Sequence, residues 1–171
     1  METDRLLLRP WSIEDYEQLY KLAKDKEVGP DCGWNPHKDE NESKLVLKNV
    51  LMVPYTYAIV LKDTNEVIGN ISLYDSEFCE NENQKEIGFW LGKNYWGKGY
   101  ISEACQYIMN YCFHELKLEK LWCGHFDYNH KSASVQKKCG FIYHSTHMNY
   151  YLPILDKYVT RILNYKENDK K

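Results

Sequence analysis

The chain has 171 residues, of which 27% are charged and 15% are aromatic, and its formal net charge is −3. This length predicts a single domain over residues 1–171 that buries roughly 70% of its unfolded surface, and the aromatic content argues against disorder. The 22 Lys and Arg are outnumbered by 25 Asp and Glu, which disfavours nucleic-acid binding through phosphate contacts. No window approaches the roughly 20 apolar residues of a membrane span, and the N-terminus lacks a signal-peptide pattern, so we expect a cytoplasmic protein without membrane association.

Cysteine and histidine spacing argues against disulfide and metal frameworks. The six cysteines contain no CxxC pair, and they are too sparse for a small secreted scaffold, so we expect free thiols. Cys105 and Cys112 lie seven apart in a helical pattern and are expected to share a buried face. The six histidines have no zinc-binding spacing, and no metal site is predicted.

The first half of the chain alternates between helical and strand-like patterns. Ser12 is a good helix N-cap, with Asp15 three residues later in the place of the usual Glu. Apolar residues then recur at helical spacing to about residue 25. We predict strands over residues 3–11, 55–61 and 67–74, and helices over residues 12–25 and about 41–51.

The second half holds the most regular helix pattern of the chain, over residues 99–116. Its apolar residues form one stripe, and Glu103 lies favourably near its positive end. A second helix over residues 131–139 is stopped by Gly140. We predict strands over residues 85–91, 121–126, 141–151 and 157–165, a frayed tail over residues 166–171, and a mixed α/β (α+β) fold.

Residues 86–101 run from a strand through a glycine-rich turn into a helix N-terminus. This arrangement presents backbone N–H groups and the positive end of a helix dipole, which suit a phosphate or pyrophosphate. Gly97 and Gly99 keep Cβ atoms away, and Lys98 adds positive charge at the rim. The alternative is an ordinary strand-to-helix turn that uses glycine only for its tight geometry.

The same turn is close to a nucleotide-binding P-loop but departs from it. Residues 92–99 fit G-x-x-x-x-G-K, but Gly99 stands where the P-loop has a magnesium-binding Ser or Thr. Tyr95 and Trp96 are also bulky where a phosphate cradle has small residues. A nucleotide hydrolase is therefore disfavoured.

Three segments together resemble one enzyme family. Trp96-Gly97-Lys98-Gly99-Tyr100, followed by Ser102-Glu103-Ala104, is similar to the coenzyme A pyrophosphate loop of the GNAT N-acetyltransferase superfamily. The tryptophan form resembles the subgroup that includes ribosomal-protein N-terminal acetyltransferases. Asn129-x-x-Ser132 with Lys138-Cys139-Gly140-Phe141, and the opening Thr3-Asp4-Arg5-Leu6-x-Leu8-Arg9 with Trp11, fit that subgroup.

The resemblance covers nearly the whole chain, with two departures. It implies one GNAT-like domain, with a central, mostly antiparallel sheet of about seven strands flanked by about four helices. Ile101 is bulkier than the Gly or Ala at the last place of the superfamily loop. Many members carry a tyrosine seven residues after the Asn as proton donor to the departing thiolate, and here that place is Gln136, which cannot serve as one.

The resemblance implies direct transfer of an acetyl group from acetyl-CoA to a primary amine. The acceptor is a protein N-terminus or a small amine such as a polyamine, an aminoglycoside or an amino acid. An amine must lose a proton before it attacks, and Glu86 is the best-placed base in its strand, acting through a water. Glu86 as a solvated or substrate-attracting carboxylate is the alternative. Ser132 is the candidate donor to the thiolate, unless it merely caps its own helix backbone.

The cofactor contacts are expected along one strand, the loop and one helix start. Alternation puts Glu86 and Trp90 on one strand face and Phe89 and Leu91 on the other, and the backbone of the latter two would pair with pantetheine as an added strand. Asn129 would hold pantetheine, cap its helix, or both. The predicted cofactor-binding residues are Phe89, Trp90, Leu91, Trp96, Gly97, Lys98, Gly99, Tyr100, Ile101, Ser102, Asn129 and Ser132.

Two further readings stay open on the sequence. The missing tyrosine and Ile101 are compatible with a non-catalytic sensor or interaction module that binds coenzyme A or acyl-CoA. Residues 31–34 and the pair Tyr150 and Tyr151 are candidates for an acceptor pocket, since acidic and aromatic groups suit a cationic amine. Aromatic residues on the last two strands would either form a homodimer seam or pack inward.

Overall fold

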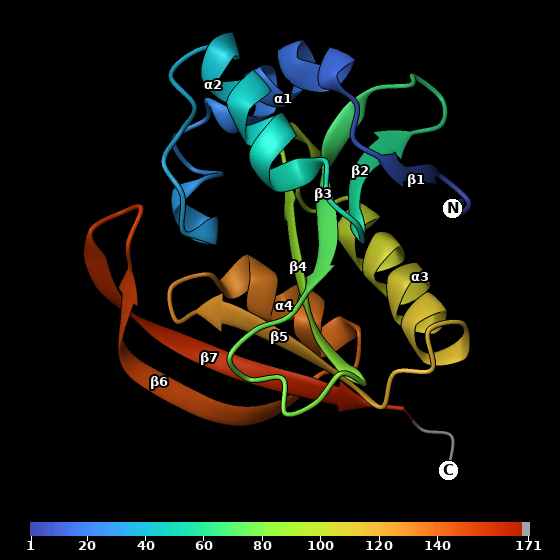
Figure 1. Cartoon of the computed structure of the whole chain (residues 1–171), viewed down its shortest axis with the longest axis vertical. Coiled ribbons are helices and arrows are strands. Elements are labelled where there is room, and N and C mark those ends of the chain that lie inside the picture. The colour runs from blue at the N-terminus through green and yellow to red at the C-terminus, as the bar shows by residue number, and fades with distance from the viewer. Residues whose placement is uncertain (169–171) are drawn as a thin grey trace. The chain divides into compact units, whose positions relative to one another are not determined.

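A computed structural model of the protein describes residues 1–168, and its elements follow the predicted order (Figure 1). Its strands are hydrogen-bonded in the order β1-β2-β3-β4-β5-β7-β6, with β4 and β5 parallel and the pairs β1–β2, β2–β3, β5–β7 and β6–β7 antiparallel. The predicted mixed fold with a seven-stranded sheet and four main helices is confirmed. The elements are β1 (Leu6–Pro10), α1 (Tyr16–Ala23), α2 (Glu40–Val46), β2 (Thr56–Leu61), β3 (Val67–Tyr74), β4 (Gln84–Leu91), α3 (Tyr100–His114), β5 (Lys120–Phe126), α4 (His130–Lys138), β6 (Ile142–Leu152) and β7 (Lys157–Glu167).

The chain divides into two compact units, which are described separately. Unit 1 comprises Met1–Ser72 and Phe89–Ala104, and unit 2 comprises Leu73–Gly88 and the described residues from Cys105 onward. The strands β3 and β4 and the helix α3 contribute residues to both units. Among residues 1–168, no helix is both long and apolar enough to cross a bilayer.

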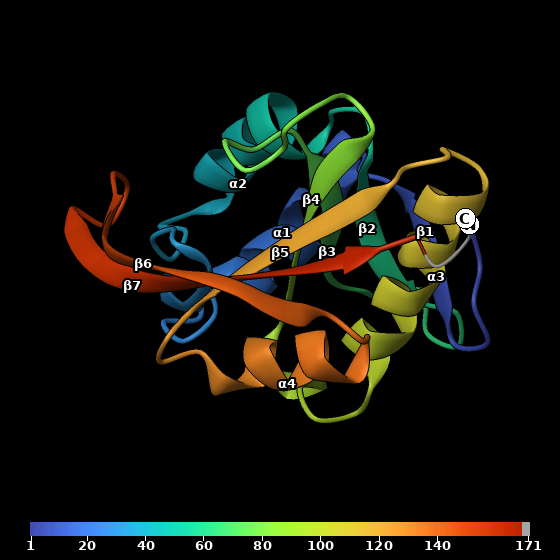
Figure 2. The ribbon, with the colours of Figure 1, turned by 90° about the horizontal axis from the view of Figure 1, so that it is seen from below.

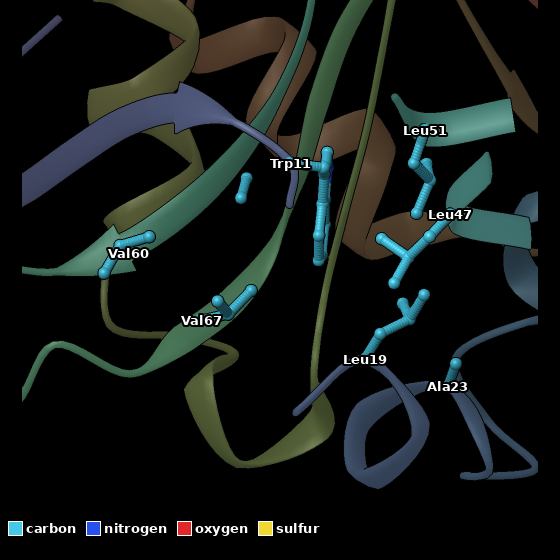
Figure 3. Close-up of a cluster of buried hydrophobic side chains, with 8 residues drawn as sticks. Trp11, Leu19, Ala23, Leu47, Leu51, Val60 and Val67 are labelled. Atoms are coloured by element: carbon cyan, nitrogen blue, oxygen red, sulfur yellow. The ribbon is translucent and has the colours of Figure 1, made fainter. Parts of the chain in front are cut away.

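The core of unit 1 is a cluster of apolar side chains from α1, from the turn that follows α2 and from the strands β2 and β3, together with Trp11 (Figure 3). The backbone N–H of Ser12 donates to Asp15 Oδ2 at 2.9 Å, so the predicted cap at Ser12 is found, although the α-helix itself begins later, at Tyr16. A short 3₁₀ turn, Ile13–Asp15, precedes α1. The cluster contains Trp11, Leu19, Ala23, Leu47, Leu51, Ala58, Val60 and Val67.

The second predicted helix ends in a π-helical turn, which the sequence pattern does not predict. After α2 the chain forms a π-helical turn, Leu47–Leu51, closed by the Met52 N–H donating to the Leu47 carbonyl at 2.8 Å. Leu47 and Leu51 on this turn are both buried, while Val50 is 57% exposed.

The core of unit 2 is formed by α3, β5 and β7. Cys105, Ile108 and Cys112 on α3 are fully buried, as the spacing of the two cysteines predicts. The strands β5 and β7 pair from Lys120↔Glu167 to Phe126↔Arg161. In Figure 2, β6 and β7 form a long, curved hairpin that continues this pairing.

Two expectations about the last strands are corrected by the structure. β7 continues through Lys166 and Glu167, because both residues pair with β5, so these two do not belong to a frayed tail. Asn168 Nδ2 also donates to the carbonyls of Phe113 and Leu118. The rest of the predicted tail, residues 169–171, lies outside the described residues. Inward packing is wrong for two aromatic side chains of the hairpin, because Tyr143 is 63% exposed and Tyr158 is 69% exposed.

Candidate active site

The glycine-rich turn of unit 1 has the backbone that its sequence predicts. After β4 and a short 3₁₀ turn, Lys93–Tyr95, the chain passes through Gly97 at φ 75° and Gly99 at φ 80° before α3 begins. Both values lie in the left-handed region that disfavours residues with a Cβ. A Cβ at Gly97 would meet no atom within 4 Å, so the space above this residue is open. The turn therefore presents exposed backbone at the positive end of a 15-residue helix.

The start of the chain braces this turn through Glu103 in the first turn of α3. Glu103 Oε1 accepts hydrogen bonds from Thr3 Oγ1 at 2.6 Å and from the Arg5 N–H at 3.0 Å, and its Oε2 accepts from Arg5 Nε at 2.7 Å. Arg5 Nη1 also donates to the Lys98 carbonyl at 3.0 Å, and its guanidinium lies 4.5 Å from the centre of the Tyr100 ring. Partial burial opposes the charge on Glu103, but the bonds from Thr3 and Arg5 lower its pKa.

Arg5 is a supporting residue that the sequence did not identify. It belongs to the opening motif, but the motif gives no indication that its guanidinium reaches a loop more than 90 residues later. The loop is thus held by a charged clamp as well as by glycine geometry.

Trp96 closes the turn on itself. Its indole Nε1 donates to the Leu91 carbonyl at 2.9 Å, which ties the loop to the end of β4. This carbonyl is one of the groups predicted to pair with pantetheine. Lys98 is exposed at the rim, while Ile101 and Ser102 are half-buried in the first turn of α3.

Trp90 takes part in packing within unit 1. Its ring stacks with Trp11 at a centroid distance of 6.5 Å and meets Trp34 edge-on at 5.7 Å. The side chain is half-buried in this packing, and the cofactor contact of Trp90 stays a prediction. Trp34 belongs to the loop that is predicted to line an acceptor pocket, and its ring packs against Trp90.

Glu86 in unit 2 is a buried carboxylate. It is 1% exposed, so the interpretation of Glu86 as a solvated strand-end group is wrong. Its Oε1 accepts a hydrogen bond from Arg161 Nη2, and its Oε2 has no hydrogen-bond partner among the described residues. A buried carboxylate oxygen without a donor is costly, which makes this atom a candidate for contact with a substrate.

Arg161 arranges a polar and aromatic group around Glu86. Its Nη1 donates to the Tyr150 hydroxyl at 3.1 Å, and its guanidinium lies 5.0 Å from the Tyr150 ring centre and 4.9 Å from that of Phe78. Desolvation and the negative charge of Glu86 raise the pKa of the nearby Tyr74 well above its ordinary value. The sequence did not identify Arg161, because its partner Glu86 lies 75 residues away on another strand.

The start of α4 positions the other predicted catalytic residue. Asn129 Oδ1 accepts a hydrogen bond from the Ser132 N–H at 3.0 Å, so the predicted cap is confirmed. Ser132 Oγ accepts a hydrogen bond from Gln136 Nε2 at 3.1 Å. The alternative interpretation, in which Ser132 only caps its own helix, predicts a bond to the helix backbone instead of this bond to a side chain. Gln136 is only 1% exposed.

The predicted site residues thus fall into two groups. Unit 1 carries the loop and the end of β4, from Phe89 to Ser102, and unit 2 carries Glu86, Asn129 and Ser132. Each group is held by its own hydrogen bonds.

The comparisons with known proteins identify the family. The acetyltransferase (GNAT) domain matches residues 5–142, so the chain belongs to the GNAT acetyltransferase family. It is 32% identical over 125 residues to the uncharacterized N-acetyltransferase p20 of Bacillus licheniformis, covering 70% of this chain and 68% of that protein. It is 31% identical over 138 residues to the uncharacterized N-acetyltransferase YnaD of Bacillus subtilis, covering 81% of this chain and 79% of that protein.

Solved structures share the fold at lower sequence identity. A GNAT acetyltransferase from Bacillus anthracis has a TM-score of 0.87 at 21% identity and covers 99% of both chains. The ribosomal-protein-S5-alanine acetyltransferase of Vibrio fischeri has a TM-score of 0.77 at 20% identity, over 99% of this chain and 97% of that chain. The microcin C7 self-immunity acetyltransferase MccE, in complex with acetyl-CoA and AMP, has a TM-score of 0.79 at 17% identity, over 96% of this chain and 93% of that chain.

Proposed function

We propose that this chain is an acetyl-CoA-dependent enzyme that transfers acetyl directly to a primary amine, with units 1 and 2 acting as one domain. The observation that carries the proposal is the braced loop of Gly97 and Gly99 at the start of α3. Its positive-φ backbone, the open space beside Gly97 and the helix dipole fit a pyrophosphate. The acetyl-CoA named with MccE supports the same ligand for this chain.

The binding roles follow the two groups of residues. In this proposal the backbone from Gly97 to Ser102 holds the pyrophosphate, and Lys98 adds charge at the rim. The backbone of Phe89 and Leu91 pairs with the pantetheine arm, which Asn129 also contacts. When bound, acetyl-CoA supplies an acetyl group already activated as a thioester.

Glu86 is the proposed base. A free amine has a pKa of roughly 8 to 10, so most of it is protonated at neutral pH and needs an acceptor for its proton. Glu86 Oε2, the buried atom without a partner, takes that proton directly or through a water. Arg161 holds Oε1 and fixes the orientation of the carboxylate.

Ser132 is the proposed donor at the other end of the reaction. Its hydroxyl stabilises the sulfur that departs with the electron pair of the broken C–S bond. In this proposal the acceptor amine is recognised near Glu86 and Tyr74, beside the rings of Phe78 and Tyr150 that lie against Arg161. Both protein N-termini and small amines fit this chemistry.

Ligand binding is tested first by thermal unfolding with acetyl-CoA, coenzyme A and Mg-ATP in parallel. A ligand at 100 times its Kd stabilises the fold by about 2.7 kcal/mol, which for a chain of this size raises Tm by roughly 5 to 11 °C. We expect this shift with both coenzyme A forms and none with Mg-ATP. A shift with Mg-ATP alone would contradict the proposal.

Turnover is tested by thiol release with a panel of acceptors. The panel contains peptides with free N-termini, a polyamine, an aminoglycoside and amino acids, with N-acetylated peptides as matched controls. We expect thiol release with at least one free amine and none with its acetylated form. A thermal shift with acetyl-CoA but no release with any amine would instead identify a binding module without turnover.

A further inference from the structure

We propose that Gln136 is a positioning residue that orients the Ser132 hydroxyl toward the departing thiolate. The inference rests on the proposed function, because it concerns the donor of that reaction. Gln136 occupies the place of the tyrosine donor found in many superfamily members, and its amide cannot itself release a proton to sulfur. Its contacts give it a different role, one helical turn after Ser132 on α4.

The amide of Gln136 is held in one orientation. Its Nε2 lies 3.1 Å from the Gly124 carbonyl oxygen and 3.1 Å from Ser132 Oγ. A backbone carbonyl only accepts hydrogen bonds, so the NH₂ group must face Gly124, and Ser132 Oγ receives its other hydrogen.

The opposite end of the amide is held equally firmly. Gln136 Oε1 accepts a hydrogen bond from Asn164 Nδ2 at 2.6 Å and lies 3.2 Å from His125 Nδ1. Gln136 and Asn164 are 1% and 9% exposed, so water does not compete freely for these bonds. A rotated amide would place two donors against Asn164 and leave the Gly124 carbonyl facing an acceptor.

This anchoring determines what Ser132 does with its proton. A hydroxyl that accepts from an amide N–H keeps its own O–H for another acceptor. The Ser132 backbone N–H is already bonded to Asn129, so the residue is held at two points. As the C–S bond of the thioester breaks, Ser132 donates a hydrogen bond to the sulfur that takes the electron pair. The proton lost by the amine balances the proton that the thiol finally gains from solvent.

A double-mutant cycle tests the inference. Gln136→Met keeps the approximate length of the side chain and removes both hydrogen-bonding groups. We expect kcat to fall about fivefold or more while KM for acetyl-CoA stays within about twofold. In the Ser132→Ala background the same substitution should change kcat by less than about twofold, because the hydroxyl that it positions is gone.

Gln84→Met is the matched control. Gln84 is another buried glutamine of unit 2, 3% exposed, and its Oε1 accepts from Trp122 Nε1 at 2.8 Å. We expect it to lower Tm but to leave kcat within about twofold in both backgrounds. Should Gln136→Met fail to fold, Gln136→Leu provides the same test.

Two results would overturn the inference while leaving the proposed function in place. One is an unchanged kcat in Gln136→Met. The other is an equal fold-loss of kcat with and without the Ser132 hydroxyl, which would mark Gln136 as a purely structural residue. A wild-type chain that binds acetyl-CoA but acetylates no amine would refute the proposed function, and this inference with it.

Discussion

The guanidinium of Arg161 lies against the bare backbone of Gly124, so close that a Cβ on the glycine would be 2.6 Å from Arg161 Nε. Glycine within a strand has no side chain to pack and weakens the strand. Here the missing side chain leaves the space through which Arg161 reaches Glu86. The carbonyl of the same glycine accepts a hydrogen bond from Gln136 Nε2. Gly124 therefore contacts both Arg161, which binds Glu86, and Gln136, which binds Ser132.

Gly124→Ala is expected to displace Arg161 and to lower the free energy of unfolding by about 1–3 kcal/mol, as overpacking of a filled site does. Urea unfolding at pH 7 measures the loss. In an Arg161→Ala background the same substitution should cost far less, since the clash partner is absent. Equal losses in the two backgrounds would show that Gly124 matters for another reason.

Removing one partner of the buried ion pair should cost more than removing both. Arg161→Met leaves the Glu86 carboxylate buried without its counter-charge, and we expect a loss of about 3–5 kcal/mol in unfolding free energy. The double variant Glu86→Met with Arg161→Met should be more stable than Arg161→Met alone. Chemical denaturation of the single and double variants tests this order, and simple additivity would contradict it.

Glu103→Gln should weaken acetyl-CoA binding without slowing the chemical step. The change removes the negative charge of the carboxylate that accepts hydrogen bonds from Thr3 and Arg5. Arg5 also donates to the Lys98 carbonyl, so we expect the loop at Lys98 to be held less firmly. We expect KM for acetyl-CoA to rise about three- to tenfold, which is about 0.7–1.4 kcal/mol and less than the roughly 1.5–3 kcal/mol of a hydrogen bond to a charged group, because the Gln side chain still accepts hydrogen bonds. Steady-state kinetics measure this, with kcat within about twofold. Glu115→Gln, an exposed residue just beyond α3, makes the same charge change as a control.

Two glycines with similar positive φ angles allow the effect of backbone strain to be distinguished from the loss of a ligand contact. Gly97 has φ 75° in the loop, and Gly140 has φ 81° after α4. Alanine at either position should cost about 1–2 kcal/mol of stability through left-handed strain. Only Gly97→Ala should also raise KM for acetyl-CoA. A similar rise in Gly140→Ala would mean that lost stability, and not the loop, controls binding.

Stability should fall on mild acidification because of a buried histidine. His37 is 8% exposed with its Nδ1 2.8 Å from Ser43 Oγ, and burial lowers its pKa although Glu42 opposes the shift. At about pH 6.5 His37 in the unfolded chain binds a proton, while His37 in the folded chain stays neutral. The contribution of His37 to the free energy of unfolding is therefore fully present above that pH and is lost as the pH falls through the folded pKa. Melting curves from pH 8 to pH 5 test this. His37→Asn should flatten the decline, and an identical slope would assign it to other groups.

The fold could be predicted from local patterns because most elements bury one regular stripe. The predicted strand over residues 67–74 coincides with β3, and the cap at Asn129 is found as expected. The π-helical turn Leu47–Leu51 could not be predicted, because it adds one residue to a turn without breaking the apolar pattern. The late end of β7 depends on pairing with Lys120, a contact that residues 166 and 167 do not encode by themselves.

Within the site, the glycine loop could be predicted because its backbone conformation and its ligand-binding groups both come from consecutive residues. Arg161 was not, since its role depends on strands distant in sequence and on the empty side of Gly124. Gln136 lies between these cases. The family pattern marks Gln136 only as a missing tyrosine, whereas its spacing of four from Ser132 on a predicted helix already places the two side chains together.

The burial of most cysteines has a practical consequence for measuring turnover. Cys105, Cys112, Cys123 and Cys139 are buried, and burial raises the pKa of Cys112 to about 12. Disulfide dyes react with the thiolates that they can reach, so the four buried sulfurs stay unmodified in the folded chain, whereas Cys79 and the exposed Cys32 are accessible. Desolvation raises the pKa of Cys32 to about 12 and slows its reaction, so a blank without acceptor amine measures the contribution of these two thiols. A steady signal from such a dye therefore counts released coenzyme A, and a late burst of four equivalents per chain reports that the enzyme has unfolded.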